Sequence, residues 1–222
     1  MKPKVYIDGK EGTTGLQIYD RLAAREDIDL LLIDEDKRKD PVERKRLMDT
    51  ADIVFLCLPD AAAREAVTLV TNPDTRIIDA STAHRTNPAW AYGLPELSAE
   101  HRAAVAASKR VANPGCHATG FIAIVYPLVK LGILPKDYPL SCFSLTGYSG
   151  GGKKMIEEYE ADERCSLLDA PRQYALSQEH KHLKEMAKLC GLDNPPVFCP
   201  IVGDFYSGME VTVTLNKEEV QG

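Results

Sequence analysis

The chain of 222 residues is long enough for about one and a half domains of the common size of about 150 residues. Its 27 basic and 33 acidic side chains give a net charge of −6, so a general affinity for nucleic acid is not expected. Hydrophobic residues make up 44% of the chain and charged residues 27%, which excludes a disordered, collagen-like or coiled-coil protein and indicates a globular one.

The sequence also carries no sign of a membrane protein or a secreted protein. No stretch approaches the roughly 20 apolar residues that cross a bilayer, and the N-terminus has no signal-peptide core, so a cytoplasmic location is expected. The six cysteines include no Cys-x-x-Cys and no zinc-like spacing, so we expect free thiols and no metal site.

The first half of the chain alternates short apolar runs with helical spacing. The runs predict strands at residues 4–8, 28–33, 53–58 and 76–80. Helices are predicted at residues 16–25 and 61–69, and the charged stretch 35–46 indicates a loop and a solvated helix. Strands that are apolar on both faces and alternate with helices are typical of a parallel sheet covered on both sides.

The pattern changes near Asn113. The sequence beyond it predicts helices at residues 118–131, 153–162 and 178–190 and strands at residues 140–146 and 209–215. We therefore expect an α/β protein with a parallel-sheet domain at residues 1–113, followed by an α+β domain at residues 114–222.

A glycine-rich turn joins the first strand to the first helix. Gly9, Gly12 and Gly15 allow a tight turn, the approach of a pyrophosphate to the backbone, and close packing of helix on strand. The N-terminus of the helix that follows presents N–H groups and a partial positive charge to phosphates. The turn predicts a Rossmann-type dinucleotide-binding domain, although G-x-x-G-x-x-G also fits a plain strand-turn-helix.

The residues after the second strand leave the type of dinucleotide open. Asp34 ends that strand, where a carboxylate can bond the ribose 2′-hydroxyl of NAD. Lys37, Arg38 and Lys39 follow shortly after Asp34 and can meet the 2′-phosphate of NADP instead.

A cysteine stands at the start of the long apolar helix. The preceding Asn113-Pro114-Gly115 makes a sharp turn that exposes the sulfur of Cys116. A thiolate at a helix N-terminus is stabilised by the partial positive charge there, and the same backbone N–H groups can hold an oxyanion. Cys116 is therefore a candidate nucleophile; the other five cysteines are interpreted as structural.

The segment from Gly147 to Lys154 matches two well-known patterns. Gly147-x-Ser149-x-Gly151 fits the nucleophile elbow of an α/β-hydrolase, and Asp169 and His180 follow in the order of a triad. The segment also resembles a phosphate loop, but Lys154 stands where Ser or Thr must bind magnesium. A glycine loop whose N–H groups contact a substrate carbonyl is the favoured interpretation.

A histidine pair lies within the last predicted helix. His182 and Glu185 are three residues apart and share one helical face, so the carboxylate orients the imidazole and favours its protonated form. Such a pair suits acid/base work near pH 7, although a solvated helix face is the common alternative. His84, His101 and His117 are interpreted as structural or exposed.

Six motifs follow one another along nearly the whole chain. They are residues 9–15 (GKEGTTG), 78–85 (IDASTAHR), 92–96 (YGLPE), 113–116 (NPGC), 147–153 (GYSGGGK) and 180–185 (HKHLKE). Each motif is modest alone, but in this order they resemble the shorter form of the N-acetyl-gamma-glutamyl-phosphate reductase family, within the aspartate-semialdehyde dehydrogenase superfamily.

The resemblance implies roles for particular residues. Cys116 matches the nucleophile, and His180, His182 and Glu185 match the acid/base motif, in which we favour His182. The expected cofactor-binding residues are Gly9, Gly12, Thr13, Thr14, Gly15, Asp34, Ser81 and Gly150. The expected substrate-binding residues are Arg85, Asn113, Ser149 and Gly151.

The resemblance also implies NADPH as the cofactor, a small acyl phosphate as the substrate, and a homo-oligomer assembled through the second domain. The expected reaction reduces N-acetyl-L-glutamyl 5-phosphate to its 5-semialdehyde and phosphate through a cysteine thioester, in arginine biosynthesis. An aspartyl or aminoadipyl phosphate reductase, a Ser149 esterase and a non-catalytic dinucleotide-binding protein stay open as alternatives. Because the family's chains are longer than 222 residues, the second domain is expected to be incomplete at its C-terminus.

Overall fold

The computed structural model describes residues 1–9 and 13–220. Its internal contacts divide the chain into two compact units, Met1–Pro114 (unit 1) and Gly115–Gly222 (unit 2). The boundary between them lies one residue beyond the predicted one, in the Pro114-Gly115 turn that precedes Cys116.

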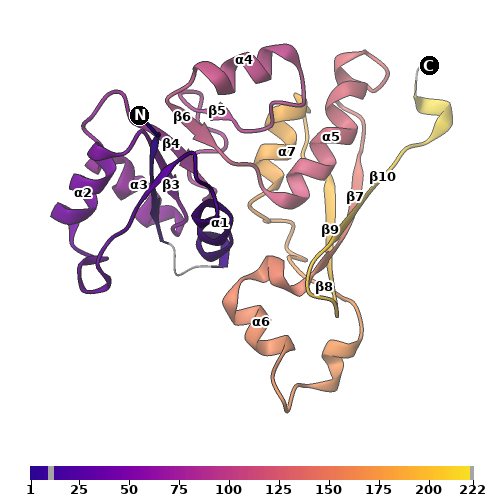
Figure 1. Cartoon of the computed structure of the whole chain (residues 1–222). Helices are drawn as coiled ribbons and strands as arrows, with labels where there is room; N and C mark the ends of the chain where they lie inside the picture. The colour runs from indigo at the N-terminus through magenta and orange to yellow at the C-terminus, as the bar shows by residue number, and fades with distance from the viewer. Residues whose placement is uncertain (10–12, 221–222) are drawn as a thin grey trace. The chain divides into compact units, whose positions relative to one another are not determined.

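Unit 1 is built on a parallel sheet, which within the described residues has six strands in the order β2-β1-β3-β4-β6-β5 (Figure 1). Its strands are β1 (Lys4–Asp8), β2 (Asp29–Leu31), β3 (Ile53–Leu56), β4 (Arg76–Asp79), β5 (Ala91–Tyr92) and β6 (Arg110–Ala112). Its helices are α1 (Thr13–Ala23), α2 (Pro41–Thr50), α3 (Asp60–Leu69) and α4 (Ala99–Ala107). This is the predicted Rossmann-type arrangement, and it is confirmed.

Helices pack against this sheet because its strands are apolar on both faces. Strand β1 contacts both α1 and α2. The core between the sheet and the helices α2 and α3 is formed by Tyr6, Leu47, Met48, Ala51, Val54, Leu56, Ala66 and Ile77. Thus α2, predicted as a solvated helix, buries Leu47 and Met48 and presents only its other face to solvent.

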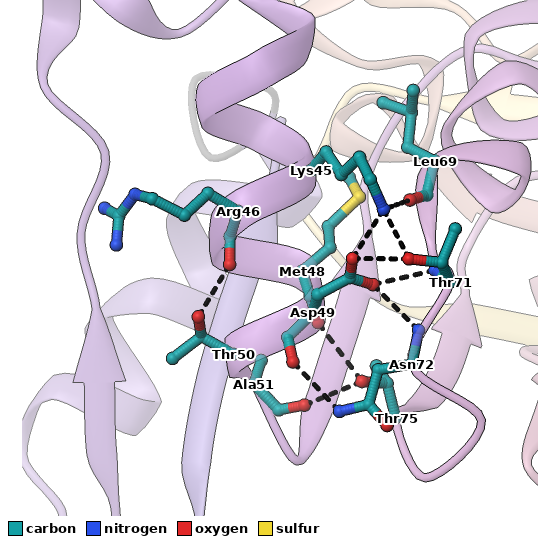
Figure 2. Close-up of polar contacts among 10 residues, drawn as sticks. All are labelled: Lys45, Arg46, Met48, Asp49, Thr50, Ala51, Leu69, Thr71, Asn72 and Thr75. Carbon is teal, nitrogen blue, oxygen red and sulfur yellow. Dashed lines mark hydrogen bonds and ion pairs between the residues drawn. The ribbon is translucent and has the colours of Figure 1, made fainter.

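A polar network ties the end of α2 to the loop after α3 (Figure 2). The Asp49 carboxylate accepts hydrogen bonds from Lys45 Nζ at 2.6 Å, from the backbone N–H of Thr71 at 2.7 Å and from that of Asn72 at 3.0 Å. Burial alone would raise the pKa of Asp49, but these donors hold it well below its ordinary value. The network fixes α2, the helix that also carries Arg44.

Unit 2 contains a mixed sheet, with strand order β10-β7-β9-β8 in the described part of the chain. Its strands are β7 (Ser141–Gly147), β8 (Arg172–Gln173), β9 (Val197–Gly203) and β10 (Met209–Thr214); β7 and β9 are parallel, and the edge strands are antiparallel to them. Its helices are α5 (Cys116–Lys130), α6 (Lys153–Tyr159) and α7 (Leu183–Cys190) (Figure 1). The predicted α+β domain is confirmed.

The two faces of this second sheet differ. On one face, α5 lies so close to β10 that a Cβ added to Gly120 would stand 2.5 Å from a methyl group of Val211. Ser144 of β7 and Pro200 of β9 are paired neighbours on this covered face, and both are buried. On the other face Phe143 is 41% exposed, which leaves an apolar surface on the sheet.

The structure also contains elements that were not predicted and one that was misplaced. Strands β5, β6 and β8 have only two or three residues each, too few for a periodic signal, and β9 contains Pro200. Helix α7 begins at Leu183 and not at residue 178, because Ala175 and Gln178 adopt left-handed backbone angles (φ 51° and 58°) that a right-handed helix excludes.

Across the described residues, no helix combines the length and the apolar character that spanning a bilayer requires.

Candidate functional site

A cavity of about 590 Å³ opens in unit 1 where the strands β1 and β3 end. From β1 the chain continues to β2 on one side, while β3 pairs on the other, so this is the point where ligands bind in open parallel sheets. The cavity is lined by Tyr6, Ile7, Asp8, Gly9, Ile33, Arg38, Lys39, Arg44, Leu58, Ala62 and Glu65.

Gly9 is required at the entrance to this cavity. Its φ is +86°, and a Cβ added there would stand 2.4 Å from the carbonyl oxygen of Cys57. Only glycine lets the chain turn out of β1 while β3 lies so close. A glycine at the turn that leaves the first strand is also what the dinucleotide-binding turn requires.

The rest of the predicted turn can be placed only in part. Gly12 lies outside the described residues, as do the side chains of Thr13 and Thr14. The backbone of both threonines opens α1, and Gly15 is buried within that helix. Their cofactor-binding roles remain predictions.

A buried ion pair inside the cavity was not predicted. Asp8 is 4% exposed, and its carboxylate accepts a hydrogen bond from Arg44 Nη2 at 2.8 Å. Burial and the Asp8 charge raise the pKa of the neighbouring Tyr6. The sequence signal for this ion pair was indirect. An acidic residue at the end of a buried apolar strand needs a cationic partner, but Arg44 stood in a stretch interpreted as solvated.

The basic residues after β2 line the cavity, whereas the acidic residue does not. Arg38 and Lys39 belong to the lining in the described part of the chain, and Asp34 does not. The Asp34 carboxylate is 71% exposed and pairs with Lys37 at 3.3 Å. The segment after β2 therefore brings two basic side chains to the cavity, Lys39 and Arg38, which also pairs with Glu35. Such side chains suit a 2′-phosphate better than a bare 2′-hydroxyl.

A second polar cluster lies at the end of β4. The buried Asp79 carboxylate accepts hydrogen bonds from the Ser81 hydroxyl at 2.7 Å and from the Ser81 N–H at 2.9 Å, and contacts His84 Nδ1 at 2.6 Å. His84 stacks on Trp90 with ring centroids 4.0 Å apart. Ser81 is thus held rigidly at the carboxyl edge of the sheet, and its cofactor contact remains a prediction.

Arg85 is partly committed to the backbone. Its Nε donates to the carbonyl of Asn113 at 2.9 Å and its Nη2 donates to the carbonyl of Ala80 at 3.1 Å. The side chain therefore braces the turn that leads to Cys116. Asn113 is exposed, and neither residue's substrate-binding role is tested by this geometry.

Cys116 is exposed and is the first residue of the 15-residue helix α5. The preceding residue, Gly115, is held by a side chain of α7: its backbone N–H donates to Glu185 Oε2 at 3.1 Å. Glu185 is 1% exposed. The buried carboxylate thus takes up one N–H group at the helix start and leaves the next ones for a substrate oxyanion.

The predicted histidine pair lies at the start of α7. His182 Nε2 and Glu185 Oε1 are 3.8 Å apart, and both side chains are almost fully buried. His180 is half-buried, and its Nδ1 accepts the backbone N–H of His182 at 3.2 Å. Burial, together with the charge of Lys181, lowers the pKa of His180. The structure therefore brings His182, Glu185 and the helix carrying Cys116 together.

His117 also belongs to this group of polar side chains. The sequence interpreted it as structural or exposed, and the structure shows that it is buried. It is 3% exposed, and both ring nitrogens are engaged: Nδ1 lies 2.6 Å from Ser144 Oγ and Nε2 lies 2.7 Å from the Tyr174 hydroxyl. Its ring centroid stands 5.5 Å from that of His182. Tyr174 carries no motif, so no signal in the sequence pointed to it.

The glycine loop forms a short 3-10 helix, Tyr148–Gly151, after β7. The N–H of Ser149 donates to the carbonyl of Tyr206, and Gly150 and Gly151 are exposed. A nucleophile elbow needs a strained serine, but left-handed non-glycine residues in the described chain occur only at Ala175 and Gln178. The predicted triad member Asp169 is instead paired with Arg164 at 2.6 Å, so the hydrolase interpretation has no geometric support.

Comparison with known proteins matches two family models to the two units. Residues 4–105 match a semialdehyde dehydrogenase NAD-binding domain, and residues 116–221 match a semialdehyde dehydrogenase dimerisation domain. Among solved structures, aspartate semialdehyde dehydrogenase II from Vibrio cholerae has a TM-score of 0.70 at 14% identity, over 96% of this chain and 74% of that one. That likeness shows the fold.

Curated relatives are much more similar in sequence. N-acetyl-gamma-glutamyl-phosphate reductase 2 of Nostoc sp. is 49% identical over 96% of this chain and 68% of its own length. The protein of the same name from Pseudomonas putida is 47% identical over 99% of this chain and 70% of its own. The predicted resemblance is thereby confirmed, and the chain belongs to the N-acetyl-gamma-glutamyl-phosphate reductase family of semialdehyde dehydrogenases.

Proposed function

We propose that this protein reduces N-acetyl-L-glutamyl 5-phosphate to N-acetyl-L-glutamate 5-semialdehyde and phosphate with NADPH, in cytoplasmic arginine biosynthesis. One observation carries the proposal: an exposed Cys116 opens α5, and Glu185 binds the preceding Gly115 while also facing His182. A thiol, an oxyanion site and an imidazole–carboxylate pair are the groups that acyl transfer through sulfur requires. The identity of the acyl group is inferred from the name of the curated relatives, N-acetyl-gamma-glutamyl-phosphate reductase.

In the first step the Cys116 thiolate attacks the acyl carbon of the substrate. The new oxyanion is held by the N–H groups of the first turn of α5, beyond the Gly115 N–H that Glu185 occupies. The carbon–oxygen bond to phosphate then breaks, phosphate leaves with the electron pair, and a thioester remains on Cys116.

In the second step the thioester becomes an aldehyde. Residues that line the unit 1 cavity would hold NADPH, which would supply the hydride. His182, in its protonated form, donates its proton to the oxyanion and gives a thiohemiacetal. The same imidazole then removes the hydroxyl proton, the carbon–sulfur bond breaks, and the semialdehyde leaves while Cys116 returns as thiolate. Glu185 keeps the His182 ring in place through both transfers.

The decisive assay runs in the oxidative direction on the full-length protein. Phosphate-dependent reduction of NADP should proceed with N-acetylglutamate semialdehyde and be at least about 100-fold slower with aspartate semialdehyde, because a site built for one acyl group leaves polar groups unpaired with another. Equal rates, or faster oxidation of aspartate semialdehyde, contradict the proposed substrate. Binding of NADP without turnover of either aldehyde would favour a non-catalytic dinucleotide-binding protein.

We assign the 2′-phosphate of NADPH to Arg38 and Lys39. Replacing both with serine should raise the KM for NADPH about 10- to 100-fold, the usual strength of charged hydrogen bonds, and leave the KM for NADH within about twofold. Lys37→Ser is the matched control, since Lys37 pairs with Asp34 and does not line the cavity. Steady-state kinetics with both cofactors measures the effect, and an equal loss for NADPH and NADH would refute the assignment.

We also propose that the protein forms a homo-oligomer through the open face of the second sheet. Phe143 is 41% exposed there, and its register partner on β9 is Cys199, followed on the same face by Ile201. The family model for residues 116–221 is named as a dimerisation domain, which supports assembly through unit 2.

Replacing Phe143 and Ile201 with aspartate should shift the protein to the monomer in light scattering, because buried like charges oppose each other across a symmetric interface. Leu167→Asp is the control, because it also replaces an apolar side chain with a charge. Leu167 is 78% exposed and lies outside this sheet face. An unchanged mass in the double variant, with an intact circular dichroism spectrum, would place the interface elsewhere.

A further inference from the structure

His117 follows Cys116 in α5 but points in another direction. Cys116 is exposed, whereas His117 is 3% exposed. Consecutive helix residues are about 100° apart around the axis, so the imidazole lies behind the thiol within unit 2 and not at the open side of the sulfur. The mechanism above makes no use of this buried ring.

The ring links the sheet to the loop between β8 and α7. Its Nδ1 lies 2.6 Å from Ser144 Oγ on β7, and its Nε2 lies 2.7 Å from the Tyr174 hydroxyl. Burial, with a smaller contribution from His180, lowers the pKa of His117 to about 4. The ring is therefore neutral near pH 7, with one nitrogen donating a hydrogen bond and the other accepting one.

Tyr174 is at the other end of this chain of hydrogen bonds, and its ring centroid stands 6.0 Å from that of His180. Burial, and then the charge of Cys116, raise the pKa of Tyr174 to about 12, so its phenol keeps its proton. The loop after it is fixed by Gln178, whose side-chain amide both donates to the carbonyl of Phe198 and accepts its N–H, each at 2.8 Å. Tyr174 thus has a defined position beside His117 and His180.

We propose that His117 is a positioning residue that holds the Tyr174 hydroxyl beside Cys116. The Ser144 hydroxyl donates to Nδ1 and Nε2–H donates to the Tyr174 oxygen, which leaves the phenolic proton for the oxyanion on the acyl carbon carried by Cys116. This arrangement adds a side-chain donor to the backbone N–H groups of α5. The inference rests on the proposed function and names a further residue group for the same reaction.

A double-mutant cycle tests the coupling. Tyr174→Phe and His117→Leu should each lower kcat about 10- to 100-fold with KM changed less than about threefold, since a donor to the oxyanion acts in the transition state. Because His117 acts through the hydroxyl, the double variant should be no slower than Tyr174→Phe alone. Losses that multiply in the double variant would overturn the proposal, since they assign independent effects to the two residues.

Conservative variants separate positioning from simple packing. His117→Gln can accept from Ser144 through its oxygen and donate to Tyr174 through its nitrogen, so it should recover kcat to within about fivefold of the wild type. If His117→Leu does not fold, Ser144→Ala replaces it in the cycle. Tyr159→Phe is the control phenol, because Tyr159 stacks on Tyr148 and takes no part in the chain; its kcat should be unchanged.

The outcomes keep this inference distinct from the proposed function. A wild-type protein that fails to oxidise N-acetylglutamate semialdehyde contradicts the proposed function itself. Wild-type turnover with an undiminished kcat in His117→Leu, or with no recovery in a folded His117→Gln, contradicts only the role of His117.

Discussion

Cys116→Ser is expected to lower phosphate-dependent semialdehyde oxidation by at least about 10³-fold, with no change in the affinity for NADP. Sulfur forms a thioester, which accepts a hydride more readily than the oxygen ester that serine would form. The described residues that line the proposed NADP cavity all belong to unit 1, so cofactor binding should persist in this variant. Steady-state kinetics and NADP titration by fluorescence provide the two measurements.

Cys165→Ser is the matched control, because Cys165 is also an exposed thiol of unit 2. It should retain full activity, and iodoacetamide should inactivate it at the wild-type rate. N-acetylglutamyl phosphate should protect both proteins from alkylation. Retention of more than a tenth of the wild-type rate in Cys116→Ser would contradict the nucleophile assignment.

His182→Asn is expected to lower kcat by about 10²- to 10⁴-fold, the usual contribution of a positioned acid/base, with a small effect on KM. Removing the imidazole leaves the oxyanion without the acid that transfers a proton to it and the thiohemiacetal without a base. Glu185→Gln should cost less, about 10-fold, because an amide oxygen can still accept the Gly115 N–H but carries no charge to hold an imidazolium. The rate of each variant should be measured across pH 6 to about 9.

His180→Asn is the informative comparison, because the sequence alone did not separate the two histidines. The Nδ1 of His180 accepts a backbone N–H, and its lowered pKa keeps the ring neutral, so it is poorly suited to donate and regain a proton. Its replacement should reduce kcat less than about 10-fold. His101→Asn, in unit 1, is a neutral control. A larger loss in His180→Asn than in His182→Asn would transfer the acid/base role to His180.

The regular elements of the chain could be predicted because their signals are local. The strand at residues 4–8 coincides with β1, and the helix expected at residues 118–131 differs from α5 by two residues at its start and one at its end. Alternating buried strands and helices then imply a parallel sheet. The prediction missed β9, where Pro200 interrupts the apolar run but is accommodated in the sheet beside Ser144.

The candidate site residues could likewise be predicted from the sequence where their role depends on one short segment. Gly9 stands at a left-handed turn and Cys116 at the start of a helix, and both features follow from residues close in sequence. The contact between His182 and Glu185 was also predictable, because side chains three residues apart lie on the same face of a helix.

Contacts between distant segments were decided only by the tertiary structure. Asp8 pairs with Arg44 across 36 residues, Gly115 with Glu185 across 70, and His117 with Tyr174 across 57. No local pattern encodes such a pair, because each side chain's partner depends on how helices pack on a sheet.

The sequence by itself thus indicated the family, the two-domain order, a candidate nucleophile and a candidate dinucleotide turn, because these depend on motifs of a few residues. The tertiary structure decided which cations line the cavity, excluded the nucleophile elbow at Ser149, and assembled the polar groups around Cys116. The physical reason is burial: Asp8, Glu185 and His117 are each less than 5% exposed, and a buried polar group must find its partner wherever folding brings one.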